Sequence, residues 1–318
     1  MNILLILGGW SSEREVSLKT GGMIEKVLLH LGHTVSRFDP ASGLDGLVSA
    51  AQQADFAFIA LHGSPGEDGL IQAMLEATGC PYQGSGPAGS FLALNKAASK
   101  ELFRQNGLLT PDWVLLPARP QKGWQPPFAY PVFIKRNTGG SSLEMERVAV
   151  PEHLEAALDR LFVHGGEFLV EPAIVGLEAT CGVLDSLEGE PVALQPILIK
   201  PQSGSGGVFD YVAKYTPGAA EEICPAPLPE DIIRKIREIS LAAHRILGLS
   251  DYSRADFLVQ EDGVPVLLEV NSLPGMTANS LLPKAAAVEG IPFEALVARL
   301  IALGLANKRG ARSGKALK

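Results

Sequence analysis

The segment from Arg254 to Asn271 constrains the fold of this chain more than any other. It reads Arg-Ala-Asp-Phe-Leu-Val-Gln-Glu-Asp-Gly-Val-Pro-Val-Leu-Leu-Glu-Val-Asn, with an apolar run on each side of an Asp-Gly pair. An Asp-Gly pair in this setting predicts a β-hairpin with a two-residue type I′ turn, which needs positive φ at both central residues. The pairs that follow from this turn are Gln260 with Pro265, Asp256 with Glu269, and Arg254 with Asn271.

Side chains alternate between the two faces of a strand, so this pairing gives the hairpin one apolar face. Its predicted members are Ala255, Phe257, Val259, Val266, Leu268 and Val270. The opposite face carries four polar side chains at one end, those of Arg254, Asp256, Glu269 and Asn271. Two carboxylates directly opposite each other lie about 5 Å apart at Cβ, and like charges placed so are destabilising.

A divalent cation would remove the repulsion between Asp256 and Glu269. Carboxylate and amide oxygens are ligands that Mg²⁺ takes in proteins, and its other positions stay with water and phosphate oxygens. Because Asn271 lies two residues after Glu269 on the same face, we predict that Asp256, Glu269 and Asn271 bind Mg²⁺, or Mn²⁺ in its place. The alternative is a structural ion cluster in which Arg254 alone neutralises the two acids.

The first third of the chain alternates strand and helix patterns. Residues 2–7 are predicted to form a buried strand before Gly8-Gly9, residues 17–31 a helix, and residues 55–61 a second buried strand that ends at His62-Gly63. Strands that alternate with helices imply a parallel sheet, whose strand carboxyl ends line a binding crevice. We therefore predict a mixed α/β fold.

The pattern changes near residues 84–95, where Gly84-Ser-Gly-Pro-Ala-Gly indicates a domain boundary. Residues 117–131, rich in proline, and residues 202–207, rich in serine and glycine, are predicted to be loops. The other predicted elements are helices over 96–106 and 231–247 and strands over 131–135, 167–171 and 179–184.

Composition bounds the class of protein. The chain has 318 residues, 46% of them hydrophobic, which is enough for two or three globular domains around one cleft. Its net charge of −8 argues against a nucleic-acid partner, and we interpret the basic residues after Leu305 as a solvated end. Cys80, Cys181 and Cys224 lack metal-ligand spacing, so we expect buried thiols. Residues 2–7 are too short for a signal peptide and no run has membrane length, which predicts a cytoplasmic protein without a membrane partner.

Lys135 ends an apolar strand and precedes Asn137-Thr-Gly-Gly-Ser-Ser142. A lysine beside a Gly/Ser loop can hold phosphate oxygens through its charge and through backbone N–H groups. Taken alone, this pattern is better explained as a plain turn. Gly8-Gly9 is not a G-x-G-x-x-G fingerprint, which disfavours a dinucleotide-dependent dehydrogenase.

Several motifs follow one another along nearly the whole chain. They are Gly8-Gly-Trp-Ser-Ser-Glu-Arg-Glu-Val-Ser17, Leu61-His-Gly-Ser-Pro-Gly-Glu-Asp-Gly69, Phe209-Asp-Tyr-Val-Ala-Lys-Tyr215, Arg254-Ala-Asp256 and Leu268-Glu-Val-Asn-Ser-Leu-Pro-Gly-Met-Thr277. In type and order they resemble the D-alanine–D-alanine ligase family of the ATP-grasp superfamily. The resemblance implies three domains, an N-terminal α/β domain with a parallel sheet and central and C-terminal domains that hold ATP between them. We place these domains at residues 1–90, 91–175 and 176–318.

The resemblance also implies roles for individual residues. The implied ATP-binding residues are Lys96 and Lys135 at the phosphates, Lys214 at the transferred phosphoryl group, Glu171, Ala173 and Ile174 around the adenine, and Glu178 at the ribose. The implied substrate residues are Glu13 at the first ammonium group, His62 near the first substrate, Ser280 and Leu281 at the second carboxylate, and Glu13, Ser141 and Tyr215 as a hydrogen-bonded set. Arg254 and the Gly275 backbone N–H would stabilise an oxyanion. The alternatives are an ordinary surface lysine at Lys96 and a hydrogen-bonded strand-end histidine at His62.

The implied reaction joins two D-alanine molecules with ATP and Mg²⁺, through a D-alanyl phosphate, for peptidoglycan precursor synthesis. A homodimer is likewise expected by resemblance, and Tyr215 favours an amine over a hydroxy acid as second substrate. The chain departs from the family where Thr138-Gly139 replaces an Arg-Glu pair and Leu143-Glu144 replaces Val-Gly. These changes leave two alternatives open, an ATP-grasp ligase for another amino-acid or hydroxy-acid pair and a nucleotide-binding relative without ligase activity.

Overall fold

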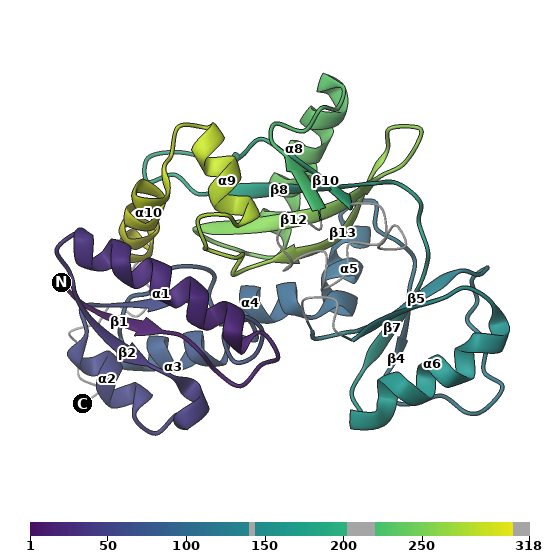
Figure 1. The fold of residues 1–318 in the computed structure, drawn as a ribbon, viewed down its shortest axis with the longest axis horizontal. Helices are drawn as coiled ribbons and strands as arrows, with labels where there is room; N and C mark the ends of the chain where they lie inside the picture. The colour runs from purple at the N-terminus through teal and green to yellow at the C-terminus, as the bar shows by residue number, and fades with distance from the viewer. Residues whose placement is uncertain (140–143, 202–219, 308–318) are drawn as a thin grey trace.

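The structure is a computed structural model that describes residues 1–139, 144–201 and 220–307. Its strands form three sheets, one after another along the chain, and helices cover and connect them (Figure 1). The predicted loop 202–207 and the predicted site residues Ser141, Lys214 and Tyr215 lie outside the described residues.

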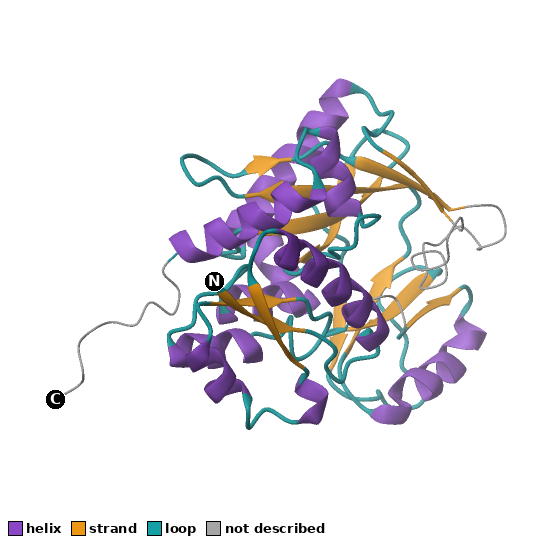
Figure 2. Cartoon of the chain, turned by 60° about the vertical axis from the view of Figure 1, so that its left-hand side comes forward, coloured by secondary structure: helices purple, strands orange, loops and turns teal. Residues whose placement is uncertain are grey.

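The first sheet is parallel, which confirms the prediction from the alternating pattern. Its strands, in the order β2-β1-β3, are β1 (Asn2–Ile6), β2 (Thr34–Phe38) and β3 (Phe56–Ile59). Its helices are α1 (Arg14–His30), α2 (Leu47–Gln53) and α3 (Leu70–Thr78). Figure 2 shows helices on both sides of these strands, the cover that a parallel sheet of apolar strands requires. The carboxyl ends of β1 and β3 lead into the loops at Gly8 and His62.

The core around the first sheet is built from both ends of the chain. Helix α10 (Phe293–Ala306) packs beside α1 and β3, with Leu296 and Leu300 fully buried (Figure 1). Gly304 of this helix lies so close to Tyr82 that a Cβ on it would be 2.4 Å from the Tyr82 carbonyl oxygen. The close approach of α10 therefore depends on a residue without a side chain.

The second sheet is antiparallel and has the order β4-β7-β5-β6. Its strands are β4 (Val114–Leu116), β5 (Val132–Arg136), β6 (Met145–Val148) and β7 (Phe168–Pro172). Helix α6 (Leu154–Leu161) covers it, and Leu154 and Leu158 join Ile134 in one core. The helices α4 (Pro87–Leu94) and α5 (Lys96–Gln105) connect this sheet to the first.

The third sheet is antiparallel and carries the predicted hairpin. Its strands are β8 (Leu177–Leu184), β9 (Val192–Ala193), β10 (Ile197–Pro201), β11 (Ala220–Ile223), β12 (Tyr252–Val259) and β13 (Pro265–Asn271), with the path β11-β10-β8-β12-β13 and β9 paired with β8. Helix α8 (Glu230–Ile246) confirms the predicted helix over 231–247, since Ile236 and Ala243 of its apolar stripe are fully buried against the sheet. Helix α9 (Leu281–Val288) packs on β8.

The hairpin pairing is confirmed at the polar end and wrong at the turn. Arg254 lies opposite Asn271 and Asp256 opposite Glu269, but Val259, not Gln260, pairs with Pro265. The Gly263 N–H donates to the Gln260 carbonyl (2.9 Å) and the Gln260 N–H to the Val264 carbonyl (3.0 Å). Among the hairpin's residues, Gly263 alone has positive φ, so the connection is a three-residue loop rather than a type I′ turn.

A β-bulge corrects the register between the turn and the polar end. The shift falls between Asp256 and Phe257, so that β13 contributes one extra residue, Leu268. Leu267 is fully buried in the core, whereas Leu268 is half-buried and faces a cleft. The prediction that Leu268 belongs to the core face is therefore wrong, because the bulge exchanges the faces of these two residues.

Two of the three cysteines are buried, as the sequence predicted. Cys80 and Cys181 are buried free thiols and Cys224 is half-buried. Burial raises the pKa of Cys181 to about 12, which makes its thiolate scarce at neutral pH.

No helix within the described ranges is long and apolar enough to cross a membrane. The domain boundaries near residues 90 and 175 stay predictions.

Substitution by alanine should have opposite effects on stability at two helical glycines, Gly304 and Gly22. Gly304→Ala should lower the free energy of unfolding by about 1–3 kcal/mol, because its Cβ meets backbone that cannot move aside. Gly22→Ala in α1 should raise it by about 0.5–1 kcal/mol, because a Cβ there meets nothing within 4 Å and alanine favours the helix. Urea denaturation of both variants measures the two signs, and equal effects would contradict the prediction.

Candidate active site

A cleft lies between the second and third sheets. Its charged lining residues are Lys96, Lys135, Arg136, Glu144, Glu171, Glu178, Arg254, Asp256 and Glu269. Its apolar lining residues include Phe133, Ile174, Ala179, Phe257, Leu258, Leu268 and Leu281. The cleft therefore gathers most of the residues that the sequence assigns to ATP and metal binding, and it combines a charged part with an apolar part, as ligand sites usually do.

Asp256 of β12 and Glu269 of β13 lie opposite each other in the cleft, as predicted. Each is neutralised by a base. Arg254 donates from Nε to Asp256 Oδ1 (2.9 Å) and from Nη2 to Oδ2 (2.8 Å), and Asn271 Nδ2 donates to the same Oδ2 at 3.1 Å. Lys96 Nζ lies 3.3 Å from Glu269 Oε2. Arg254 therefore does not neutralise the two acids alone, and the cluster has one base for each carboxylate.

The donors at this end of the cleft fit a magnesium ion that also binds phosphate. The side chains of Asp256 and Glu269 are 20% and 23% exposed, so both can be reached from the cleft. Within the described ranges, no three His, Cys, Asp or Glu side chains are grouped to hold a metal by themselves. Two carboxylates and an amide agree with the few protein ligands that Mg²⁺ takes beside phosphate oxygens and water. The metal-binding role of these residues stays a prediction.

Two lysines bind the two oxygens of the buried Glu171. Lys100 Nζ is 3.0 Å from Oε1, and Lys135 Nζ is 2.9 Å from Oε2. Lys100 is fully buried and also donates to Thr110 Oγ1 at 2.8 Å. Burial lowers the pKa of Lys100 to about 8. Burial also opposes the charge of Lys135, but the carboxylates of Glu171 and Glu269 together outweigh it and raise the pKa of Lys135.

The lysine pair leaves an excess of positive charge beside the acids of the cleft, which suits phosphate oxygens. Lys100 was not among the residues predicted from the sequence. Its signal was its position on α5, four residues after Lys96 and hence on the same side of the helix. The contacts of Glu171 are with these lysines, so its predicted place beside an adenine stays a prediction.

The connection between β7 and β8 borders the apolar part of the cleft. The Ala173 N–H donates to the Pro131 carbonyl (2.9 Å), which fixes this connection against the start of β5. Ile174 lines the cleft, and Glu178 lies opposite Leu258 on the neighbouring strand. The structure thus places Ala173, Ile174 and Glu178 together, in surroundings that suit a planar base and its sugar.

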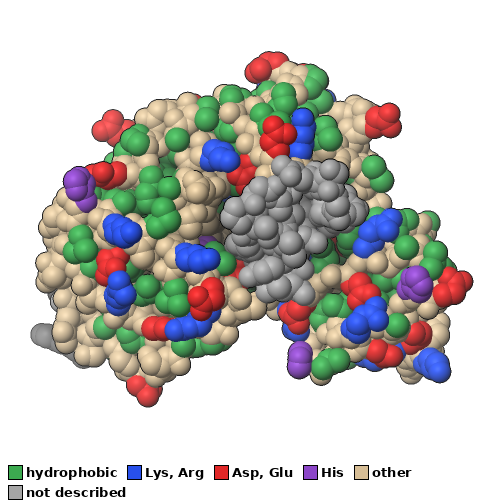
Figure 3. Space-filling model, in the orientation of Figure 1, with side chains coloured by type: hydrophobic (Ala, Val, Ile, Leu, Met, Phe, Trp, Pro, Cys, Tyr) green, Lys and Arg blue, Asp and Glu red, His purple; other side chains and the backbone are tan. Residues whose placement is uncertain are grey.

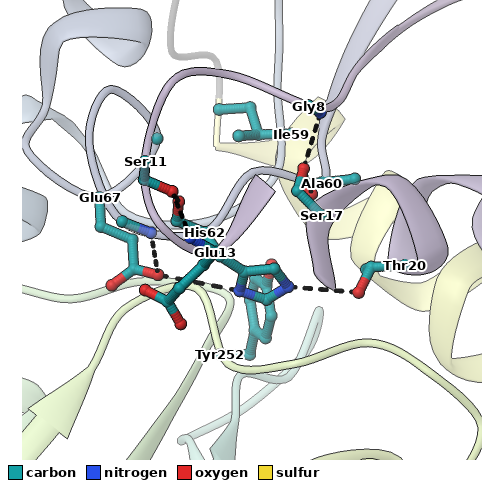
Figure 4. Close-up of polar contacts among 12 residues, drawn as sticks. Gly8, Ser11, Glu13, Ser17, Thr20, Ile59, Ala60, His62, Glu67 and Tyr252 are labelled. Atoms are coloured by element: carbon teal, nitrogen blue, oxygen red, sulfur yellow. Dashed lines mark hydrogen bonds and ion pairs between the residues drawn. The ribbon is translucent and has the colours of Figure 1, made fainter. Parts of the chain in front are cut away.

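A second group of polar residues lies at the carboxyl ends of β1 and β3 (Figure 4). His62 Nε2 is 3.2 Å from Thr20 Oγ1, and His62 Nδ1 is 3.9 Å from Glu67 Oε1. The Gly63 N–H donates to Glu67 Oε1 at 3.0 Å. The buried Glu13 lies beside them, since a Cβ on Gly63 would be 3.3 Å from Glu13 Oε2. His62 is thus a hydrogen-bonded residue at a strand end, and its role toward a substrate stays a prediction.

Burial decides the charge of His62 and Glu67. Burial lowers the pKa of His62, against the opposing attraction of Glu13. Burial raises the pKa of Glu67 to about 8, and repulsion from Glu13 adds to this effect. Both side chains are therefore neutral near pH 7, and their contact is not a salt bridge. The charge of Arg254 adds to the lowering of the pKa of His62 and opposes the rise in that of Glu67, so this group adjoins the acidic end of the cleft.

The segment before α9 brings three predicted residues together. A Cβ on Gly275 would lie 2.9 Å from Ser280 Oγ. Ser280 Oγ accepts a hydrogen bond from the Thr277 N–H (3.1 Å) and lies 2.8 Å from Thr277 Oγ1. Leu281 begins α9 and lines the cleft. The predicted oxyanion and carboxylate contacts of this segment stay predictions, as do the roles of Ser141, Lys214 and Tyr215, which lie outside the described residues.

Comparison with known proteins agrees with this architecture. Residues 42–85 match the model of the D-ala D-ala ligase N-terminus and residues 102–302 that of the D-ala D-ala ligase C-terminus. The chain is 60% identical over 305 residues to the D-alanine–D-alanine ligase of Nitratidesulfovibrio vulgaris, covering 96% of this chain and 98% of that protein. It is 52% identical over 309 residues to the ligase of Lawsonia intracellularis, covering 97% and 100%.

A solved structure gives the same result. The D-alanine–D-alanine ligase of Bacillus anthracis complexed with ATP matches with a TM-score of 0.82 and 32% identity, covering 97% of this chain and 99% of that one. The two antiparallel sheets and the cleft between them thus form an ATP-grasp fold. Within that class, the chain belongs to the D-alanine–D-alanine ligase family.

The raised pKa of Glu67 predicts how stability depends on pH. Between its ordinary pKa of 4.5 and about 8, the carboxyl is protonated in the folded chain and ionised in the unfolded one. The unfolded state then binds fewer protons, so stability falls as pH rises through this window. Glu67→Gln should remove about 2–4 kcal/mol of the loss between pH 5 and pH 8, at 1.36 kcal/mol per pKa unit.

Urea denaturation at both pH values measures this difference. Glu261→Gln is the matched control, because Glu261 is exposed on the hairpin loop and should keep the wild-type dependence. A wild-type pH dependence in Glu67→Gln would show that Glu67 is ionised in the folded chain.

Proposed function

We propose that the chain is a D-alanine–D-alanine ligase that forms D-alanyl-D-alanine with ATP, for peptidoglycan precursor synthesis. One observation carries the proposal. The acidic end of the cleft adjoins the group around Glu13, since Arg254 binds Asp256 at 2.8 Å and its charge opposes the rise that burial causes in the pKa of Glu67. A nucleotide in the cleft and an amino acid beside Glu13 would therefore meet at Arg254.

A ligase of this kind must make a carboxylate into an acyl donor. Phosphorylation by ATP gives an acyl phosphate, whose leaving group is phosphate instead of oxide, and the amine of the second D-alanine can attack it. Mg²⁺, when bound, neutralises phosphate charge during this transfer, and Asp256, Glu269 and Asn271 would hold it. The protein's own task is then to place the groups and to complement the charge that develops.

The residues of the cleft would bind ATP, and those of the second group, around Glu13, would bind the first substrate. Lys96 and Lys135 would bind phosphate oxygens, and Lys214 would join them at the transferred phosphoryl group. Ile174, Ala173 and Glu171 would border the adenine and Glu178 the ribose. The common cleft that Lys96, Lys135, Glu171, Ile174 and Glu178 line supports this assignment.

The substrate residues would act on both sides of the reacting carboxyl. Glu13 would bind the ammonium group of the first D-alanine, with the neutral His62 beside it, and Ser280 and Leu281 the second carboxylate. Arg254 and the Gly275 N–H would stabilise the oxyanion that forms on amine attack. Ser141 and Tyr215 would complete a hydrogen-bonded set with Glu13. The burial of Glu13 beside Gly63 supports its part in this arrangement.

The proposal extends to partners and location. We expect a cytoplasmic homodimer whose partners are small molecules. Figure 3 shows acidic and basic side chains interspersed on one face of the molecule, which supports a small-molecule ligand over a polyanionic one. The domains would follow the boundaries at 90 and 175, with ATP between the second and third.

The decisive test is an ADP-release assay with D-alanine, L-alanine and D-lactate added singly and in pairs, followed by mass spectrometry of the products. D-alanine alone should give ADP, phosphate and D-alanyl-D-alanine. A mixed product with D-lactate would instead support a ligase for another substrate pair, as the changes at Thr138-Gly139 and Leu143-Glu144 allow. ATP binding without ADP release for any substrate would identify a non-catalytic relative.

Glu269→Gln should lower the rate of ADP release at least about 100-fold, because it removes one of the two charges that attract the cation. The amide keeps the shape of the side chain, so circular dichroism should show an unchanged fold. Glu261→Gln, at the other end of the same hairpin, is the control and should keep the wild-type rate. An active Glu269→Gln enzyme would exclude the predicted metal site.

A further inference from the structure

The loop between β1 and α1 is held by one carboxylate outside the cleft. Asp39 directly follows β2, and its Oδ1 accepts hydrogen bonds from the Gly9 N–H (2.9 Å) and the Ala41 N–H (2.9 Å). Arg14 binds both oxygens of Asp39, Nη1 to Oδ1 at 3.0 Å and Nη2 to Oδ2 at 2.6 Å. Arg14 Nη1 also donates to the Gly9 carbonyl at 2.7 Å. Asp39 and Arg14 together therefore bind both backbone groups of Gly9.

The carboxylate of Asp39 also packs directly on Gly8. A Cβ on Gly8 would lie 2.6 Å from Asp39 Oδ1, so only glycine permits this contact. Gly8 and Gly9 have φ values of 86° and 78°, a region that glycine enters freely but does not hold by itself. Two adjacent glycines in this conformation would cost much backbone entropy to order, and fixed hydrogen bonds to both are the way to order them.

The far side of the same loop is fixed to the substrate group. Ser17 Oγ accepts from the Gly8 N–H (2.8 Å), and Ser11 Oγ donates to the His62 carbonyl (2.6 Å). The Glu13 N–H donates to Ser11 Oγ at 3.2 Å. Hydrogen bonds thus hold the loop at both ends, at Gly8 and Gly9 through Asp39 and Ser17 and at Ser11 and Glu13 through the His62 carbonyl, and only Trp10 separates the two anchored parts.

We propose that Asp39 and Arg14 are positioning residues, which hold the Gly8–Gly9 turn so that Glu13 meets the ammonium group of the first D-alanine. The proposal rests on the proposed function and names residues that do not touch substrate. The Arg14 hydrogen bond lowers the pKa of Asp39 to about 2, so the carboxylate stays charged at every working pH. Asp39 and Arg14 act on the orientation of Glu13, not on the nucleotide.

A neighbouring ion pair, Glu25–Arg37, allows a comparison, because it does not contact the Gly8–Gly9 turn. Glu25 of α1 and Arg37 of β2 also form a two-pronged ion pair between the same two elements. Arg37 is 61% exposed, and neither side chain has a described hydrogen bond to the Gly8–Gly9 turn. Because this pair joins α1 to β2 without reaching the turn, Glu25–Arg37 is a matched control for Arg14–Asp39.

The test compares steady-state kinetics of Asp39→Asn, Arg14→Lys and Glu25→Gln with those of the wild-type full chain. Asp39→Asn removes the charge that holds Arg14, and Arg14→Lys keeps the charge but loses the two-pronged contact. We expect the KM for D-alanine to rise about tenfold in Asp39→Asn, the loss of one charge-assisted hydrogen bond, and less in Arg14→Lys. The KM for ATP should change less than about twofold in both, and Glu25→Gln should match the wild type.

Two outcomes would overturn the proposal. One is an unchanged KM for D-alanine in variants that remain folded by circular dichroism. The other is a parallel rise in the KM values for D-alanine and ATP, which would mean general loosening of the fold. If Asp39→Asn does not fold, Arg14→Lys decides alone, because its side chain is 38% exposed and tolerates exchange. Wild-type enzyme that forms no D-alanyl-D-alanine would instead refute the proposed function.

Discussion

The architecture depends on two carboxylates that backbone pairing forces together. Asp256 and Glu269 face each other across β12 and β13, and neither can move away without breaking the ladder. Their repulsion has to be balanced, and here Arg254 and Lys96 balance it. The charges of these two bases also oppose the rise that burial causes in the pKa of Glu67 in the neighbouring group. We expect that Arg254 and Lys96 turn to phosphate and oxyanion once a cation neutralises the acids, so that one charge balance links nucleotide and substrate.

The same cleft also contains the opposite arrangement, one acid between two bases. There a single buried acid, Glu171, binds two lysines, and one of them, Lys100, has no exposed surface at all. Burying an ammonium group is costly, which is why its pKa falls to about 8. A second lysine beside an acid that already has one basic partner would lower the stability of the fold if its role were structural only. It is understandable where phosphate oxygens supply the missing negative charge beside Lys135.

The pairing of Asp256 with Glu269 was predicted correctly from the sequence, although the turn was wrongly predicted to have two residues. The three-residue loop shifts the register by one, and the bulge at Leu268 shifts it back, so two local errors cancel at the site. Asp-Gly is compatible with both loops, and the choice between them depends on packing that a local pattern does not contain. The parallel sheet and α8 were predictable because their apolar periodicity is local. Lys100 was missed because its partner Glu171 is distant in sequence and only the fold joins them.

The remaining problem for such a chain is to align two bodies built from separate sheets, and the buried Asp251 is one of the places where they are joined. It directly precedes β12 and has φ 67°, the one positive φ among the described residues other than glycine. Its Oδ2 accepts from the Gly84 N–H at 2.6 Å, its Oδ1 accepts from Asn307 at the end of α10, and its own N–H donates to Asp185. Aspartate tolerates this conformation better than most residues, and the bonds from Gly84 and Asn307 of the first body, with the bond to Asp185, hold it there. The strand that begins at Tyr252 then carries Arg254 and Asp256 into the cleft, so the position of these two side chains depends on how this buried carboxylate is held.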